Sequence, residues 1–285
     1  MSGDPQGALA ALGTAALWAG SYTAFTLAVR RIGADSLNRL RLLVALALLV
    51  LAHLAVEGTP IPLHAGSGRW LWLSLSGVIG FALADALLFR ALLHLGAHRT
   101  SLVAALIPVV STFLAWAAFG EKLAWHQALA SLGVVGGILL VLARRRPRED
   151  RARKGRLTLG VLFALGAVLA QASRYLLSVL GMRGGFPPLS TNVIQILAAT
   201  CAAWIGAARR HGWAETLAAL GDRRAAAATA AGAVLGPTLG VTLSLIALGR
   251  TSVGVASTLM AVTPVFLLPV TWIVFGERPT WRAYV

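Results

Sequence analysis

Two ionisable residues stand inside strongly apolar stretches of this sequence, where a charge is uncommon. Asp85 lies within FALADALLFR, and Arg174 lies within QASRYLL. A charged side chain in such a setting faces a protein interior, has a polar partner and marks a site for a substrate, an ion or a proton. Asp85 and Arg174 are therefore the first candidates for binding chemistry.

A structural role is the alternative for each of the two residues. Asp85 is equally compatible with a fixed ion pair to Arg41 or Arg90, which would hold helices together without binding a substrate. Arg174 is also compatible with a long side chain that extends to the outer membrane interface. The sequence leaves both alternatives open.

Polar and aromatic residues at matching depth extend the two candidates into two groups on opposite sides of the membrane midplane. Residues three apart on a helix are neighbours on its surface, as are Gln171 with Arg174 and Asn192 with Gln195. We predict a substrate cavity between the groups that closes alternately at either end. The predicted substrate-binding residues are Trp18, Ser21, Tyr22 and Asp85 on one side, with Arg41 as a further candidate, and Gln171, Arg174, Asn192 and Gln195 on the other.

The composition places these residues in a membrane protein. Hydrophobic residues make up 58% of the 285-residue chain and charged residues 12%, and the mean hydropathy is +0.77. Apolar runs recur at about 18–25 residues, a length at which a helix crosses a hydrocarbon core of about 30 Å. We predict an all-α polytopic protein with nine spans, near residues 7–29, 37–56, 70–93, 100–119, 126–143, 157–181, 189–208, 226–248 and 252–275.

The Lys and Arg residues cluster near the ends of these spans. A net charge of +15 can indicate nucleic-acid binding, but the basic residues do not gather on one soluble face, so we predict no nucleic-acid partner. Alternate loops hold 20 of the 25 Lys and Arg residues, including those of RRRPREDRARKGR at 144–156. By the positive-inside rule the N-terminus lies outside the cell membrane and the 144–156 linker lies in the cytoplasm.

The second half of the chain repeats the first. PVVSTFLAWAAFGEKLAW begins at Pro108 and PVFLLPVTWIVFGERPTW begins at Pro264, and the two align without a gap. Five spans per half is an odd number, so the second half must be inverted relative to the first, as in many secondary transporters. We predict a first repeat at 7–143, the basic linker at 144–156 and a second repeat at 157–285.

Matching prolines and glutamates accompany the repeat. Pro108 and Pro264 stand inside corresponding spans, where a proline kinks a helix, so we predict that they form hinges or line the cavity. An ordinary kink, tolerated by neighbouring helices, is the alternative. Glu121 and Glu277 each precede the next span, where a carboxylate stabilises a helix start, and we assign them to structural turns rather than to proton transport.

The second copy of the repeated phrase is followed by a single residue, Val285. In the first copy about 18 further residues form the fifth span. We therefore expect either that the tenth helix is truncated or that the protein has a nine-helix form.

Together these motifs resemble the EamA-like proteins of the drug/metabolite transporter superfamily. The resemblance rests on LWAGSYTAF, on the arginine that opens the second span, on GVIGFALADALLFRALLHLGAHRTSLVAALIPV, and on FGEK and FGER before a Trp. It implies ten helices in two five-helix halves, a central cavity, and export or exchange of small metabolites.

The expected function is secondary transport, with export as the direction, of a small polar or amphipathic metabolite such as an amino acid. Protons would be coupled if Asp85 titrates, and a substrate carboxylate would gain a partner if Arg174 faces the cavity. The sequence has no G-x-S-x-G, H-E-x-x-H or Walker motif, so we expect no enzymatic activity, no cofactor and no bound metal. We expect a monomer or homodimer in the lipid bilayer. A passive facilitator and a non-transporting accessory protein are the alternatives.

Overall fold

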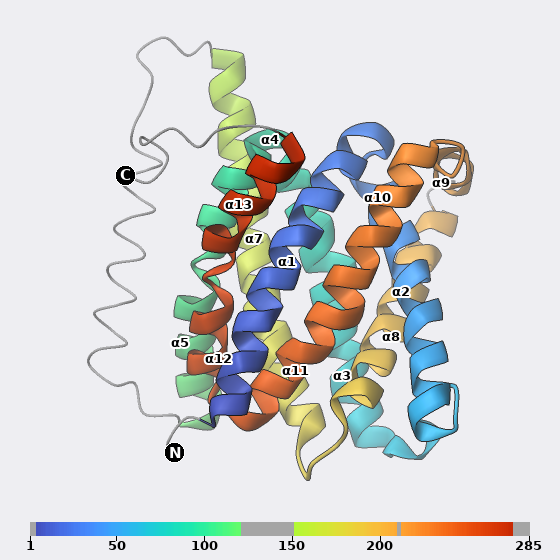
Figure 1. Ribbon diagram of the computed structural model, residues 1–285, viewed down its shortest axis with the longest axis vertical. Coiled ribbons are helices and arrows are strands. Elements are labelled where there is room, and N and C mark those ends of the chain that lie inside the picture. The colour runs from blue at the N-terminus through green and yellow to red at the C-terminus, as the bar shows by residue number, and fades with distance from the viewer. Residues whose placement is uncertain (1–3, 121–150, 210–211, 276–285) are drawn as a thin grey trace.

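The computed structural model describes residues 4–120, 151–209 and 212–275, and all regular structure within them is helical (Figure 1). Seven of its helical stretches are long and apolar enough to cross a membrane, which agrees with the predicted polytopic all-α class. The predicted fifth span at 126–143 lies outside the described residues, as do Glu121 and Glu277. The seven stretches are Pro5–Ile32, Ala34–Glu57, Ser67–Gly96, Leu102–Phe119, Leu157–Met182, Pro188–Ala208 and Arg223–Arg250.

The first half begins with two long helices joined by a tight turn. Helix α1 (Pro5–Ile32) starts where the Asp4 carboxylate accepts a hydrogen bond from the Gln6 amide, which satisfies a free N–H of the first turn. It ends at Gly33, whose φ of 76° favours glycine, and α2 (Ala34–Glu57) follows directly. The remaining elements are the short helix η1 (Leu63–Ala65), α3 (Ser67–Gly77), the π-helical segment η2 (Val78–Ala84), α4 (Asp85–Ala104) and α5 (Ile107–Phe119).

The described part of the second half contains the same kinds of element. Its first helix, α7 (Arg151–Met182), runs opposite to α1: in Figure 1 α1 rises from the bottom of the bundle and α7 descends from the top. This direction agrees with the predicted inversion. The elements that follow are α8 (Pro188–Arg209), α9 (Trp213–Ala219), α10 (Arg223–Ala233), the π-helical segment η3 (Val234–Gly240), α11 (Val241–Arg250), α12 (Val253–Met260) and α13 (Thr263–Phe275).

The two π-helical segments stand at equivalent positions of the two halves. Segment η2 at 78–84 and segment η3 at 234–240 have the same length, and each lies 156 residues from the other, the offset that also relates Pro108 to Pro264. A π turn widens the helix and is frequently found at functional sites. The repeat therefore extends to the local backbone irregularities as well as to the helix order.

The spans that contain Pro108 and Pro264 are broken rather than kinked. Two residues separate the end of α4 at Ala104 from the start of α5 at Ile107, and a break of two residues also separates α12 from α13. Each proline stands in the first turn of the new helix, where its missing N–H costs no hydrogen bond. Each of these spans is therefore two helices at this point rather than one kinked helix.

The two halves interlock through their third spans. Helices α3 and α4, with η2 between them, pack against α7, whereas α10, η3 and α11 pack against α1. Glycines allow the backbones to approach at both contacts. A Cβ on Gly80 would lie 1.9 Å from Cδ of Arg174, and a Cβ on its equivalent, Gly236, would lie 2.4 Å from Oγ of Ser21. Both contacts between the halves therefore use a glycine at the equivalent position to allow close approach.

Candidate functional site

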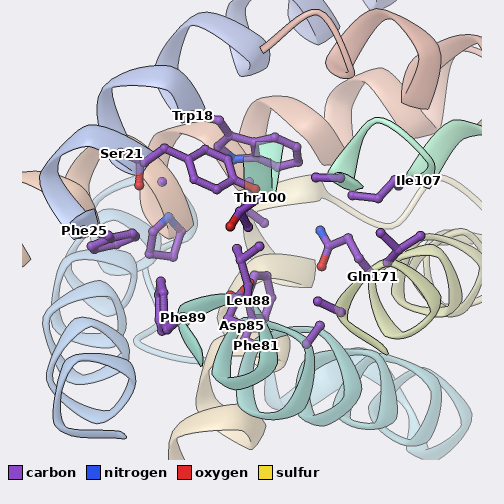
Figure 2. A pocket seen from close by; sticks show the side chains of 18 of the residues that line it. Trp18, Ser21, Phe25, Phe81, Asp85, Leu88, Phe89, Thr100, Ile107 and Gln171 are labelled. Carbon is purple, nitrogen blue, oxygen red and sulfur yellow. The ribbon is translucent and has the colours of Figure 1, made fainter. Parts of the chain in front are cut away.

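A cavity lies between the two halves (Figure 2). Its wall comes from α1, α2, η2, α4 and α5 of the first half and from α7, η3 and α11 of the second. Such a position, between inverted repeats and beside irregular helix segments, is where secondary transporters bind their substrates. The cavity is therefore the candidate site.

Aromatic rings form much of the cavity wall. Trp18 and Tyr22 of α1 line it together with Phe25, Phe81 and Phe89. The rings of Phe25 and Phe89 meet edge to face, with centroids 5.4 Å apart. Aromatic faces provide a large apolar contact area and also attract positive charge, so this wall suits a ligand with an apolar body.

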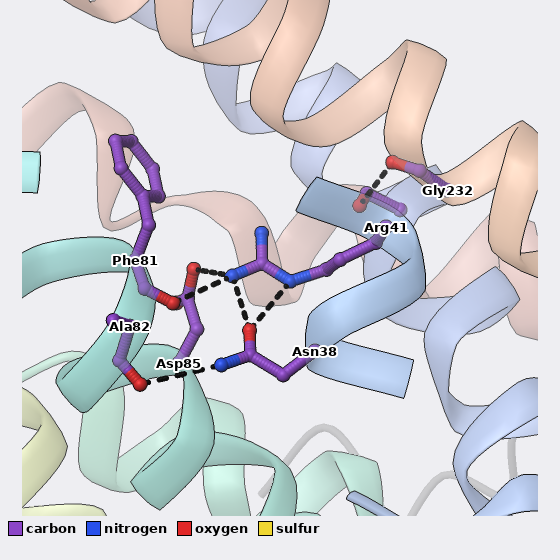
Figure 3. A network of polar contacts seen from close by, with 7 residues as sticks. Asn38, Arg41, Phe81, Ala82, Asp85 and Gly232 are labelled. Atoms are coloured by element: carbon purple, nitrogen blue, oxygen red, sulfur yellow. Dashed lines mark hydrogen bonds and ion pairs between the residues drawn. The ribbon is translucent and has the colours of Figure 1, made fainter. Parts of the chain in front are cut away.

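Asp85 and Arg41 form an ion pair at the cavity wall (Figure 3). The Nη2 atom of Arg41 lies 2.6 Å from Oδ2 of Asp85. The Arg41 side chain is only 2% exposed, whereas that of Asp85 is 18% exposed and lines the cavity. Asp85 thus combines the two roles that the sequence left open, because it has a structural partner and also faces the cavity. The other predicted partner, Arg90, bonds to Asp35 instead.

Asn38 positions the Arg41 guanidinium. Its Oδ1 accepts hydrogen bonds from Nε and Nη2 of Arg41 at 3.0 and 2.7 Å, and its Nδ2 donates to the Ala82 carbonyl at 3.2 Å. The Phe81 carbonyl accepts a further bond from Arg41 Nη2. Both carbonyls belong to η2, so the polar pair on α2 holds the π-helical segment in place.

Ser21 is a cavity residue whose hydroxyl is already used. Ser21 Oγ donates to the Gly232 carbonyl of α10 at 3.0 Å, and this bond is drawn in Figure 3. Trp18 and Tyr22 line the same wall and also a smaller neighbouring cavity, which Pro264 borders as well. Pro108 is buried and lines neither cavity.

Arg174 lies behind the cavity wall, and its side chain points into the protein interior. Its side chain is fully buried, and its guanidinium lies 4.9 Å from the Phe81 ring centroid and 4.8 Å from that of Tyr175. Gln171, one turn earlier on α7, lines the cavity opposite Phe25 and Phe89 (Figure 2). Arg174 therefore does not extend to the membrane interface, and the alternative that it does is wrong.

Asn192 and Gln195 lie outside the cavity. Asn192 Nδ2 donates to the Pro237 carbonyl of η3 at 2.8 Å and to Thr242 Oγ1 at 3.0 Å. Gln195 Nε2 donates to Ser76 Oγ and Ser178 Oγ, which lie on α3 and α7. The structure thus separates these two residues from Gln171 and places the cavity-lining residues of both predicted groups around one cavity.

One contact of Asn192 has a counterpart in the first half of the chain. Asn192 and Gln195 are three residues apart on α8, as Asn38 and Arg41 are on α2. Asn192 bonds to the Pro237 carbonyl, and Pro237 is the equivalent of Phe81, whose carbonyl binds Arg41. Sequence reasoning missed Asn38, although the matching spacing of the two polar pairs was a usable signal.

Known proteins share the sequence pattern and the fold. A model of the EamA-like transporter family matches residues 5–143 and 158–285. A search of curated proteins found no match. One solved structure, described only as a crystal structure of a protein, has a TM-score of 0.71 and 19% identity over 98% of this chain and 91% of the other, which shows a common fold. Because the family match covers nearly the whole chain and both halves of the helical bundle, the chain belongs to the EamA-like transporter family.

Proposed function

We propose that this protein exports a small polar or amphipathic metabolite across the cell membrane by alternating access through the cavity between its halves. The observation that carries the proposal is the cavity itself, which is lined by residues of both halves and contains one partly exposed carboxylate, that of Asp85. A change in how the halves pack would change the side from which the cavity is reached. An amino-acid-like compound fits its combination of aromatic and charged groups.

Close packing at one end of the bundle supports this mechanism. Near the start of α1 a Cβ on Gly7 would lie only 2.6 Å from Cγ2 of Thr251, so the two halves are in tight contact there. An ion pair between Asp4 and Arg250, 3.1 Å long, lies at the same end. This end would be extracellular in the proposed topology, with the N-terminus outside and the 144–156 linker in the cytoplasm. We infer a gate at this end that opens during transport.

The first prediction is that Asp85→Asn abolishes most substrate counterflow in proteoliposomes. A carboxylate that binds substrate by a charge-assisted hydrogen bond contributes about tenfold or more to affinity. Counterflow of the unaltered protein is first screened with pools of small metabolites to identify the substrate. Counterflow of the variant is then measured with that substrate. Flux with and without a pH gradient shows whether protons are coupled, and a passive facilitator would show no such dependence.

Two control variants separate the role of Asp85 from a general loss of structure. Asp35→Asn removes a carboxylate from the more exposed ion pair with Arg90 and should leave counterflow unchanged. Asp85→Glu retains the charge and should retain part of the activity. Full counterflow by a folded Asp85→Asn protein would exclude this carboxylate from substrate binding, and no counterflow by the unaltered protein with any pool would favour a non-transporting accessory role.

A further inference from the structure

The Arg174 guanidinium is fully buried and forms no direct ion pair in the described part of the chain, although Asp85 lies near enough to act on it electrostatically. No carboxylate pairs with it within residues 4–120, 151–209 and 212–275. Arg41 of α2, which is also fully buried, has Asp85 as its partner. An unpaired charge that is removed from water strongly destabilises a fold unless another group compensates for it.

The contacts that Arg174 makes do not satisfy all of the hydrogen-bond donors of its guanidinium. With the Gln171 amide in the orientation that satisfies its hydrogen bonds, Gln171 Oε1 accepts from Nη2 of Arg174 at 3.0 Å and from Nε at 3.2 Å. The Nη1 atom is buried and has no hydrogen-bond partner in the described part of the chain. The rings of Phe81 and Tyr175 flank the guanidinium.

Gln171 connects this group to the cavity. It lines the cavity wall, whereas Arg174 lies one helical turn behind it. A guanidinium prefers a carboxylate, which can accept two parallel charge-assisted hydrogen bonds, over a neutral amide oxygen. The Gln171 amide oxygen therefore occupies the place where a carboxylate oxygen would bind more strongly.

We propose that Arg174 is the carboxylate-binding subsite of the transporter, and that Gln171 occupies it until the carboxylate of the substrate takes its place. The inference rests on the proposed function, because it assumes that the cavity holds the transported molecule. It narrows the substrate class to monocarboxylates, including zwitterions whose ammonium group binds near Asp85. Gly80 is part of this subsite, because the absence of its side chain makes room for the Arg174 stem.

Gln171→Glu tests the subsite without removing the arginine. The new side chain has nearly the same shape and supplies a permanent carboxylate to Arg174. We expect the midpoint of thermal unfolding in detergent to rise by about 3 °C or more without any ligand. We also expect the affinity for monocarboxylates to fall about tenfold or more, since the subsite is already occupied. Gln171→Ala, the matched control, should keep carboxylate binding and should not gain thermal stability.

Binding is measured as the change in unfolding midpoint with a panel of monocarboxylates from acetate to 3-phenylpropionate, and with phenethylamine as a probe without a carboxylate. At least one monocarboxylate should stabilise the unaltered protein and not the Gln171→Glu variant. The inference is overturned if no monocarboxylate stabilises the unaltered protein, or if Gln171→Glu is not more stable than Gln171→Ala. These readouts do not depend on transport, so a failure of metabolite counterflow would count against the proposed function and not against the subsite.

Discussion

Arg41 has more polar contacts than any other side chain in the network around the cavity. Its guanidinium binds Asp85, Asn38 and the Phe81 carbonyl, and it lies 5.1 Å from the centroid of the Phe89 ring. These contacts hold the Asp85 carboxylate at the cavity edge. At the scale of the residue, Arg41 lines the cavity and also positions the Asp85 carboxylate beside it.

Arg41→Met should lower the stability of the protein by about 3–5 kcal/mol, because it leaves the mostly buried Asp85 carboxylate without its ion-pair partner. The change in unfolding midpoint in detergent measures this effect. Arg90→Met breaks the more exposed pair with Asp35 and should cost at most about 1 kcal/mol. Equal losses in the two variants would show that burial does not distinguish the two ion pairs.

Residue positions along the membrane normal could be predicted from the sequence, but the direction of each side chain could not. Asp85, Trp18 and Tyr22 were predicted at the cavity, and the structure places them there. Asn192 was predicted to join Gln171 because both have similar depths, yet it bonds to η3. The face that a helix presents depends on the packing of its neighbours, which residue spacing in one span does not reveal.

At the scale of the element, each half contains a π-helical segment that a regular α-helix would lack. The π-helical segments η2 and η3 accept hydrogen bonds from side chains of α2 and α8 respectively. Composition did not predict these segments, and the prolines did not distinguish a kink from a break. Gly80 and Gly236, which stand at equivalent positions in the two segments, show that close approach is required at both.

Gly80→Ala should destabilise the protein by about 1–3 kcal/mol and impair transport, because the added methyl group overlaps the Arg174 side chain. The unfolding midpoint and the counterflow rate measure the two effects. Gly206 lies in α8 with nothing within 4 Å of an added Cβ. Gly206→Ala should therefore leave both quantities unchanged or raise the stability slightly. If Gly80→Ala behaved in the same way, the close contact between α7 and η2 would be unimportant.

Asp222 joins the start of α10 to the end of α1 outside the membrane-spanning segments. Its carboxylate accepts hydrogen bonds from the Ala225 and Arg224 amides and lies 2.6 Å from Nε of Arg31. The amide hydrogen bond from Ala225 and then Arg31 lower the pKa of Asp222 below its ordinary value of 3.8. Because the pKa is lower in the folded state, the stabilisation is complete above pH 3.8 and is lost as the pH falls through the folded-state pKa.

Asp222→Asn should retain the helix cap and lose the ion pair, whereas Asp222→Ala should lose both, so the Ala variant should have the lower unfolding midpoint at neutral pH. Unfolding midpoints measured across the acid range should show a smaller decrease for either variant than for the unaltered protein. Identical pH profiles for all three proteins would contradict a stabilising role for this carboxylate.

At the scale of the whole molecule, the described helices form two halves that run in opposite directions and meet through their third spans. The described helices show this inversion, and the odd number of spans per half predicted it. A substrate cavity between two polar groups was predicted, but of the second group only Gln171 lines the cavity described above. The inward direction of Arg174 and the packing of Asn192 against η3 account for the difference.

The central claim is that the cavity between the halves is reached alternately from the two sides of the membrane. Leu88 lines the cavity, so a Leu88→Cys protein that also carries Cys201→Ser reports access through a single thiol. Its rate of labelling by a membrane-impermeant maleimide is measured from each side, with and without saturating substrate. The account predicts labelling from both sides, with substrate changing the two rates in opposite directions. Labelling from one side only, under every condition, would contradict it.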